Sequence, residues 1–385
     1  MRIVFVSNYF NHHQRPLSDA LYKICAGEYY FISTAEMSAE RRSLGYGEDN
    51  IPTYVKYTYK TEAERLECQA LIDSADVVIC GSAPYAMLTM RLKKGLLTFK
   101  YCERPYKKGV SLFKRPLHMW RAFRKYTRFK NFYVLCASAY TPVDFSKMGA
   151  FIGKTYKWGY FTALKEYENV DALITEKTPA SILWVARFIP LKHPEFPLEL
   201  AKRLKDEGYT FKLGMIGNGE LEEAIRASIS RMGLSDCVEL LGTMKPDAVR
   251  AHMEKNEIFI FTSDRNEGWG AVLNESMNSA CAVVANSAIG SVPFLLTDGE
   301  NGYMYRDGDF EDFYNKVKKL LDDADTRLRL SRNAYTTMAE EWNAENAARK
   351  LVVLCEQMLA GAYRPFPHES GVCSKAKILK DGWYK

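Results

Sequence analysis

Short apolar runs with the pattern of buried strands alternate with longer helix-like segments along most of this chain of 385 residues. Strands that are joined through helices run parallel, so this alternation predicts mostly parallel sheets with helices on their faces. In the first part of the chain we predict strands at 2–6, 29–33, 77–80, 97–102 and 132–136, and helices at 17–25, 63–73 and 142–147.

A polar stretch without hydrophobic periodicity, residues 165–179, interrupts this pattern, and the alternation then restarts. In the second part we predict strands at 181–186, 211–216, 238–241, 257–262 and 282–285, and helices at 197–205, 221–232, 271–280, 310–323, 326–337 and 347–359. A chain of this length exceeds one typical hydrophobic core. We therefore expect two α/β domains: a first domain at 1–164, a linker at 165–179, a second domain at 180–345, and a C-terminal helix and tail at 346–385.

The composition indicates a globular protein, with 47% hydrophobic and 26% charged residues. No apolar run approaches the roughly 18 residues that a membrane span needs. Residues 2–7 are too short and too abruptly polar for a signal peptide, so we interpret them as a first strand. The nine cysteines are scattered singly, which favours reduced thiols and a cytosolic compartment.

Positive charge is concentrated in one segment, residues 91–130. Fourteen basic residues and a single acid, Glu103, lie there, so the rest of the chain is net acidic although the net charge is +6. Within 112–130, apolar residues recur at helical spacing while cations lie mostly opposite. The apolar residues are Phe113, Pro116, Leu117, Trp120 and Phe123, and the cations are Lys114, Arg115, Arg121, Arg124, Lys125 and Arg128.

This amphipathic pattern is typical of a helix that lies on an anionic membrane surface, and each cation there can contribute about 1 kcal/mol. Two alternatives stay open. The helix could pack against its own domain, or the charge could bind nucleic acid. No recognised nucleic-acid motif accompanies the charge, so we expect no nucleic-acid partner.

Two glutamates eight positions apart, Glu267 and Glu275, lie on either side of a glycine-containing turn. The turn follows the predicted strand at 257–262 and leads into a predicted helix, so Glu267 falls beyond the carboxyl end of a strand. Open α/β sheets bind their ligands at that edge. Gly268 and Gly270 allow the backbone to approach a ligand closely, and the amino end of the helix favours a phosphate.

These residues resemble a known family. The ordered run Ser263, Glu267-Gly268-Trp269-Gly270, Glu275-Ser276-Met277 and Val283-Val284 is similar to the E-x7-E signature of retaining glycosyltransferases of family 4, which build bacterial surface polysaccharides among other products. The resemblance implies the GT-B fold, in which two Rossmann-like domains face a central cleft and a late helix crosses back to the first domain. It also implies that Glu267 holds hydroxyls of the donor sugar and that Glu275 holds the ribose, with Gly268, Trp269 and Gly270 in the donor site.

Two cations, Arg187 and Lys192, follow the predicted strand at 181–186. They resemble the G-R-x4-K element of the same family, although Ala186 stands where glycine is usual. In that family both cations grip the donor diphosphate. Fixed cations stabilise the negative charge that grows on a departing diphosphate and can take the place of a metal ion, so we expect no metal and no cofactor.

Two further glycine turns are similar to family elements that border the nucleotide. Gly217-Asn218-Gly219 follows one predicted strand, and Gly242-Thr243 follows the next. Neither is a dinucleotide fingerprint, because that motif opens the first βα unit, so we disfavour a nicotinamide dehydrogenase. The segment Gly290-Ser291-Val292-Pro293-Phe294 departs from the family pattern at Ser291 and Phe294, and Asp298-Gly299-Glu300-Asn301-Gly302 follows it closely.

In the first domain the candidates are His12 and His13, after the first strand, and Glu103, after a later one. By position they could contact the acceptor or the donor sugar. For the two histidines, an ordinary loop that caps the next helix is an equally good interpretation.

From these residues and the resemblance we expect a metal-independent retaining hexosyltransferase. Its donor would be a nucleotide sugar, UDP- or GDP-linked, and its acceptor a glycan or a lipid-linked glycan. We expect a cytoplasmic enzyme held peripherally on the inner face of the membrane through 91–130. The alternatives are another GT-B enzyme, such as a nucleotide-sugar epimerase or a phosphorylase, and a non-catalytic membrane-associated sugar-nucleotide binder.

Overall fold

A computed structural model describes residues 1–38, 50–107, 109–361, 368–380 and 382–384, and it divides the chain into two compact units. Unit 1 takes its described residues from Met1–Ala163 and Glu341–Asp381, and unit 2 takes its own from Leu164–Glu340 and Gly382–Lys385. The expected architecture of two parallel-sheet α/β domains is confirmed. Lys108 of the basic segment and residues 362–367 of the expected tail lie outside the described residues.

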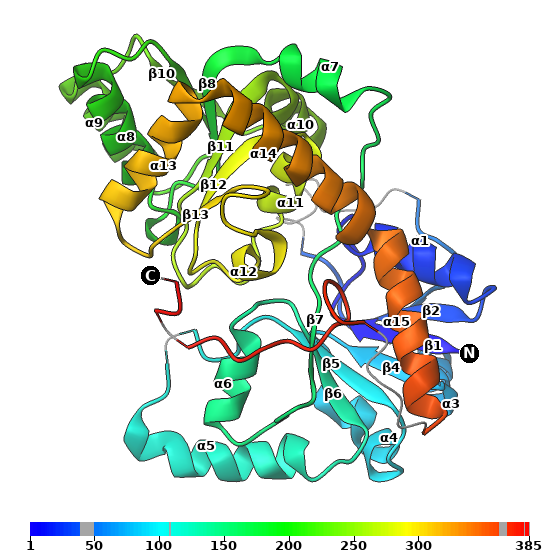
Figure 1. Cartoon of the computed structure of the whole chain (residues 1–385). Coiled ribbons are helices and arrows are strands. Elements are labelled where there is room, and N and C mark those ends of the chain that lie inside the picture. The colour runs from blue at the N-terminus through cyan, green and yellow to red at the C-terminus, as the bar shows by residue number, and fades with distance from the viewer. Residues whose placement is uncertain (39–49, 108, 362–367, 381, 385) are drawn as a thin grey trace. The chain divides into compact units, whose positions relative to one another are not determined.

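Unit 1 is built on a sheet of seven parallel strands in the order β3-β2-β1-β4-β5-β6-β7 (Figure 1). The chain adds the first strands on one side of β1 and the later strands on the other. The strands are β1 (Ile3–Ser7), β2 (Tyr29–Ser33), β3 (Val55–Tyr57), β4 (Val77–Cys80), β5 (Thr98–Cys102), β6 (Phe132–Cys136) and β7 (Thr155–Lys157).

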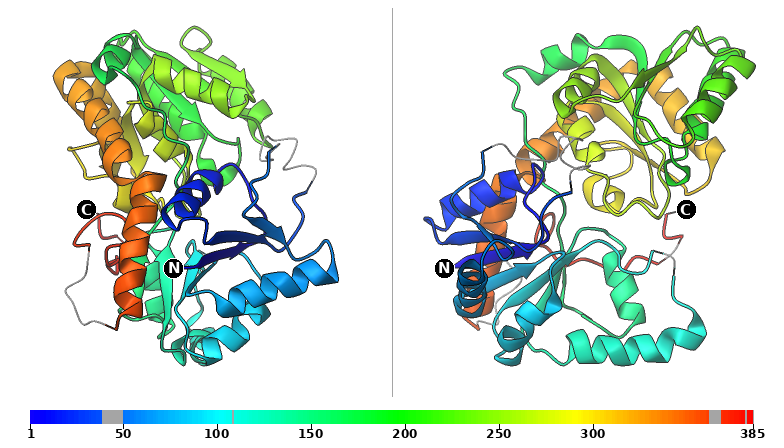
Figure 2. Two further views of the ribbon diagram at one scale, coloured as in Figure 1. Left: turned by 90° about the vertical axis from the view of Figure 1, so that its right-hand side faces the viewer. Right: turned by 180° about the vertical axis from the view of Figure 1, so that it is seen from behind.

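Helices follow most of these strands and cover the sheet of unit 1. They are α1 (Arg15–Ile24), α3 (Glu62–Ser74), η2 (Tyr85–Leu88), α4 (Thr89–Lys93), η3 (Leu112–Lys114), α5 (Arg115–Ala122), η4 (Phe123–Thr127) and α6 (Thr141–Lys147). The late helix α15 (Ala344–Leu359) packs beside α1, as Figures 1 and 2 show. The expected return of a late helix to the first domain is therefore confirmed.

Unit 2 holds a sheet of six parallel strands in the order β10-β9-β8-β11-β12-β13. Its strands are β8 (Thr178–Val185), β9 (Lys212–Ile216), β10 (Val238–Gly242), β11 (Asn256–Phe261), β12 (Ala282–Asn286) and β13 (Tyr303–Tyr305). Counted within the unit, this is the order 3-2-1-4-5-6 of nucleotide-binding α/β sheets. The direction of strand addition reverses between β8 and β11.

The helices of unit 2 lie on both faces of this sheet (Figure 1). They are α7 (Val170–Thr175), η5 (Pro190–Lys192), α8 (Glu195–Asp206), α9 (Glu222–Arg231), α10 (Pro246–Lys255), α11 (Val272–Asn278), α12 (Val292–Leu295), α13 (Phe310–Asp322), α14 (Ala324–Thr336) and η6 (Thr337–Glu341). The core between them is apolar, with Trp184, Leu200 and Phe313 almost fully buried.

Several short elements escaped the sequence analysis. β3, β7 and β13 contain three residues each, which is too few to show a hydrophobic period. Residues 165–179, which we expected to be irregular, contain α7 and the start of β8. The side chain of Asn169 caps α7 by accepting a hydrogen bond from the amide of Ala172 at 2.9 Å, so one polar residue suffices to begin this helix.

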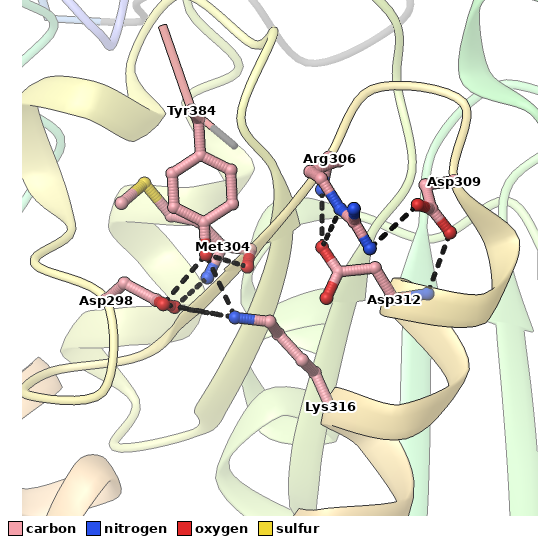
Figure 3. Close-up of polar contacts among 7 residues, drawn as sticks. All are labelled: Asp298, Met304, Arg306, Asp309, Asp312, Lys316 and Tyr384. Carbon is pink, nitrogen blue, oxygen red and sulfur yellow. Dashed lines mark hydrogen bonds and ion pairs between the residues drawn. The ribbon is translucent and has the colours of Figure 1, made fainter.

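Part of the free hydrogen-bonding edge of strand β13 is occupied by Tyr384, near the end of the described chain (Figure 3). The phenol oxygen of Tyr384 lies 2.8 Å from the carbonyl of Met304 in β13 and 2.7 Å from the carboxylate of Asp298. Lys316 of α13 donates to the same phenol oxygen at 2.9 Å. An edge carbonyl that is occupied in this way is less available to pair with another strand.

A buried arginine, Arg91, joins three segments of unit 1. Its guanidinium is fully buried and donates to four backbone carbonyls, those of Ile72, Ala75, Asp76 and Leu97, and to the hydroxyl of Thr98. Burial lowers the pKa of Arg91 to about 10, so the group is still charged at neutral pH.

We predict that Arg91→Met lowers the free energy of opening of unit 1 by roughly 3 kcal/mol or more, because the buried carbonyls lose charged donors. Hydrogen exchange of the amides in β4 and β5 measures this opening. The neighbouring exposed residue provides the control, and Lys93→Met should change the value by about 0.5 kcal/mol or less. Equal effects of the two substitutions would contradict this role of Arg91.

Candidate active site

The residues that the sequence singled out in unit 2 follow four neighbouring strands. Because all these strands are parallel, their carboxyl ends share one edge of the sheet. Along that edge, in strand order, lie Gly242 at the end of β10 and Thr243 after it, Gly217 and Asn218 after β9, Arg187 and Lys192 after β8, and Glu267 after β11.

Two of these residues, Lys192 and Glu267, are in contact where the strand order reverses, between β8 and β11. The ammonium group of Lys192 contacts the carboxylate of Glu267, and the two side chains are only 15% and 14% exposed. The residues are 75 positions apart in the chain, and the pairing of β8 with β11 brings them together. A fixed cation and a fixed carboxylate thus stand side by side at the ligand-binding edge of the sheet.

The turn that carries Lys192 is fastened to the end of β11. The hydroxyl of Thr262 donates to the carbonyl of Lys192 at 2.7 Å, and the amide of Asp264 donates to the carbonyl of Leu191 at 3.0 Å. Thr262 is itself held by the indole N–H of Trp184 in β8, at 2.8 Å. The backbone around Lys192 therefore has little freedom to move away from β11.

The turn that carries Glu267 is organised by Asp264. The amide of Glu267 donates to the carbonyl of Asp264 at 3.0 Å, and the amide of Asn266 donates to the carboxylate of Asp264 at 2.7 Å. Gly270 has a φ of +82°, and an added Cβ atom would lie 2.3 Å from the ring of Phe261. Only glycine fits at that point of the turn.

Trp269, which the resemblance places in the donor site, is fully buried, and its indole donates to Asn274 at 2.9 Å. Its side chain belongs to the core, where Phe294 lies beside it at a ring distance of 6.4 Å. A contact between Trp269 and a ligand is therefore left to its backbone.

The glycines after β9 hold the loop that carries Arg187. A Cβ atom on Gly217 would lie 1.9 Å from the carbonyl oxygen of Ala186, and one on Gly219 would lie 2.5 Å from that of Phe188. The amide of Phe188 donates to the carbonyl of Asn218 at 2.7 Å. The Gly217-Asn218-Gly219 turn is thus a close-packed support for the backbone on both sides of Arg187.

Glu275 lies on α11 and keeps some exposed surface although protein surrounds most of it. Burial raises the pKa of Glu275, and the positive charge of Arg250 opposes that rise. Arg250 comes from α10 and donates to Asn278 at 2.7 Å. Arg250 could not be recognised from the sequence, because the pattern at α10 predicted no helix and no motif marks this arginine.

In unit 1, the structure connects two of the three candidates through a residue that the sequence analysis did not select. Tyr160 donates its hydroxyl to Glu103 at 2.8 Å, and its ring lies nearly parallel to that of His13 at 6.5 Å between ring centres. Lys107 also donates to Glu103, at 2.9 Å. The rings of His12 and His13 are 3.9 Å apart.

The surroundings of His13 set the charge state of its ring. Burial and the neighbouring His12 lower the pKa of His13 to about 3, so its ring is neutral at physiological pH. The loop that carries Glu103 is fixed by the next residue, because Arg104 forms a buried pair with Asp144 at 3.0 Å. A neutral imidazole and a fixed carboxylate are suited to binding hydroxyl groups.

The helical part of the basic segment exposes its apolar side chains. Exposure reaches 97% for Phe113, 54% for Trp120 and 57% for Phe123, and Leu117 is also exposed. The side chains of these four residues are therefore not packed against unit 1, whereas Ala122 of the same helix is buried. Two cations of the segment 91–130, Arg104 and Lys107, pair with acids. In the described part of the chain, no acid pairs with the six cations of its helical part, which are Lys114, Arg115, Arg121, Arg124, Lys125 and Arg128.

A search of the described helices finds none that is both long enough and apolar enough to cross a membrane.

We predict that Gly217→Ala displaces the Arg187 loop, because the added methyl group has no room beside Ala186. Gly233→Ala is the matched control, since Gly233 also has a positive φ but meets nothing within 4 Å. The control should cost only about 1 kcal/mol of backbone strain. A nucleotide-binding assay and thermal unfolding should both show a larger loss for Gly217→Ala, and equal losses would contradict this support role.

The chain is similar to known proteins both in sequence and in structure. The family model described as glycosyl transferases group 1 matches residues 167–337. Among curated proteins, the amylovoran biosynthesis glycosyltransferase AmsK of Erwinia amylovora is 26% identical over 185 residues, which are 47% of this chain and 45% of that protein. The lipopolysaccharide core biosynthesis glycosyltransferase LpsE of Rhizobium meliloti is 27% identical over 171 residues, 44% of this chain and 48% of that protein.

The chain thus spans about half the length of the curated relatives it matches. Solved structures match it over almost its whole length. Anabaena Alr3699/HepE in complex with UDP has a TM-score of 0.67 at 15% identity and covers 94% of this chain and 100% of its own. Sucrose-phosphate synthase from Thermosynechococcus elongatus has a TM-score of 0.64 at 14% identity, with the same coverage. At such identity the likeness shows the fold alone: the chain has the GT-B fold, and its residues 167–337 are similar to the family described as glycosyl transferases group 1.

Proposed function

We propose that this chain is a retaining glycosyltransferase of surface polysaccharide biosynthesis. It moves a hexose-type sugar from a nucleotide-diphosphate donor, UDP- or GDP-linked, to a glycan acceptor. The observation that carries the proposal is the contact between Lys192 and Glu267 at the reversal of the strand order. A donor of this kind offers an anionic diphosphate and a neutral polyol, joined by the bond that breaks.

The two charges of this contact take different parts of the donor. Lys192 and Arg187 bind the diphosphate and stabilise its negative charge as it leaves, so the transfer needs no metal ion and no cofactor. Glu267 accepts hydrogen bonds from hydroxyls of the sugar and fixes its orientation. The bond from the anomeric carbon to the phosphate oxygen breaks, and the acceptor hydroxyl forms the new bond on the same face. Its proton passes to the departing phosphate.

Glu275 binds the ribose of the nucleotide. A carboxylate can accept hydrogen bonds from both ribose hydroxyls, and the positive charge of Arg250 favours the ionised form of Glu275 against the effect of burial. In unit 1, His12, His13 and Glu103 bind hydroxyls of the acceptor or of the donor sugar. The neutral ring of His13 and the hydrogen-bonded carboxylate of Glu103 support this role.

The comparisons support the class of enzyme. They do not identify its sugar or its acceptor. AmsK and LpsE carry names in amylovoran and lipopolysaccharide core biosynthesis, and HepE has been solved in complex with UDP and glucose. A GT-B phosphorylase would bind inorganic phosphate and no nucleotide, whereas a non-catalytic binder would bind the nucleotide without turnover. Hydrolysis of a nucleotide sugar in the absence of acceptor separates the transferase from both.

We predict that Glu267→Gln lowers kcat for transfer by roughly a hundredfold or more, because the neutral amide is a weaker acceptor for the sugar hydroxyls. Radiolabelled UDP- and GDP-sugars with an isolated polysaccharide acceptor provide the assay. Glu239→Gln, at an exposed position of β10, is the control and should retain full activity. Unchanged turnover in Glu267→Gln would contradict the site assignment.

We also propose that the segment 91–130 holds the enzyme on the cytoplasmic face of an anionic membrane, where a lipid-linked glycan acceptor would be found. Its exposed helical part, residues 112–128, would make the contact, because Arg91 and Arg104 are buried in unit 1. The exposed Phe113, Trp120 and Phe123 can enter the interface between headgroups and acyl chains, while the surrounding unpaired cations face anionic lipid. Arg124 lies over the ring of Trp120 at 4.9 Å, so charge and apolar surface occupy the same patch.

We predict that replacing Arg121, Arg124 and Lys125 together by Glu abolishes sedimentation with vesicles that contain phosphatidylglycerol. The control is the triple variant Arg231→Glu, Lys245→Glu and Lys255→Glu, which changes the net charge equally at exposed positions of unit 2. It should retain binding. Retained binding by the first variant, or stronger binding of the wild type to duplex DNA than to vesicles, would reject the membrane role.

A further inference from the structure

One histidine of unit 2, His193, lies between the two turns of the candidate site and was not selected by the sequence analysis. It follows Lys192 directly and has a φ of +49°, in the left-handed region. A residue other than glycine pays a strain of about 1 kcal/mol or more there, and such residues persist where their surroundings hold them in place. The amide of His193 donates to the carbonyl of Pro190, and its carbonyl accepts from the amide of Phe196.

The ring of His193 faces an acid on each side. Its Nδ1 atom lies 2.7 Å from the carboxylate of Glu195 at the start of α8. Its Nε2 atom lies 3.7 Å from the carboxylate of Asp264, beyond the end of β11. Only the protonated ring carries a hydrogen on both nitrogens, so only the imidazolium can donate toward both acids.

Asp264 is also the residue that organises the turn of Glu267, through the amides of Asn266 and Glu267. The backbone on the other side of His193 carries Lys192. The ring therefore connects the turn of the cation with the turn of the carboxylate, by a path of side-chain and backbone contacts on one edge of the sheet.

We propose that His193 is a positioning residue for the donor site, and that its imidazolium holds the turns of Lys192 and Glu267 in register for a nucleoside-diphosphate ligand. The proposal rests on the proposed function for the identity of that ligand. His193 itself does not touch the donor. It acts through Asp264 and through the backbone of Lys192.

The groups that face His193 favour its charged form. The hydrogen bond to Glu195 raises the pKa of His193 most, burial lowers it, and the negative charges of Glu195, Asp264 and Asp307 raise it further. Asp307 follows β13 and is held by Asn286 of β12 at 2.8 Å. Because the pKa is raised in the folded chain, the link is complete at lower pH and is lost as pH rises through that pKa.

The first experiment measures the dissociation constants of UDP and GDP by calorimetry between pH 5.5 and 8.5, for the wild type and for His193→Asn. Asparagine tolerates the left-handed backbone but carries no charge. The effect of the ligand's own ionisation cancels in the ratio of the dissociation constants of the two proteins. We expect the variant to bind at least about fivefold more weakly at the low end and equally at the high end. His252→Asn, on α10, is the control and should leave the ratio at one throughout.

A second variant separates positioning by charge from a purely structural role. Glu195→Gln removes the strongest stabiliser of the imidazolium but leaves the ring in place. We expect it to retain the low-pH affinity and to move the loss of affinity to lower pH. A ratio for His193→Asn that is independent of pH, or a Glu195→Gln profile that does not move, would overturn the proposal.

A third measurement needs no ligand. In the nucleotide-free chain, the NMR signals of the His193 ring and of the Asn266 and Glu267 amides should titrate with one common midpoint, and Glu195→Gln should lower it. Amides that do not follow the ring would overturn the inference whatever the site binds. Co-titration without any nucleotide binding would instead leave the link intact and refute the proposed donor.

Discussion

Parallel pairing of every described strand in the two sheets is the constraint on which the candidate site depends. It sends the carboxyl ends of β8, β9, β10 and β11 to one edge, and the reversal of strand order between β8 and β11 leaves their loops free to diverge around a ligand. Lys192 and Glu267 meet because their strands are neighbours in the sheet, although a long stretch of chain separates them. The strand order thus determines where the site lies, and the local sequence supplies its side chains.

Further hydrogen bonds and close packing fix the backbone that carries Lys192, Glu267 and Arg187. Thr262 and Asp264, neither of which has a proposed contact with substrate, hold the backbone on both sides of the pair. The glycines of the Gly217 turn do the same for Arg187 by filling space that no side chain could share. Preorganisation of this kind is useful where charge develops in a transition state, because the protein dipoles need not reorient when it forms.

The long, periodic elements and the glycine turns could be predicted from the sequence, because their patterns are local. Helix α15 and the positions of Arg187 and Glu267 beyond strand ends belong to this class. The return of α15 to unit 1 was implied by the family resemblance, and the roles of Arg187 and Glu267 stay predictions. Tyr160, Arg250 and His193 could not be predicted, because each acts through a partner that is distant in the chain or through an unusual backbone angle. The burial of Trp269 escaped for a related reason, since a tryptophan between two glycines has the same local pattern whether its ring faces a ligand or the core.

The return of the chain to unit 1 has a consequence for the order of folding during synthesis. Unit 2 is nearly continuous in sequence and can close its core as soon as residue 340 has left the ribosome. Unit 1 cannot, because α15 packs against α1 and the backbone of Cys373 and Ser374 bonds to Lys157 of β7. The first unit to be translated is therefore the last to be completed, and until then the face of α1 that packs against α15 stays uncovered.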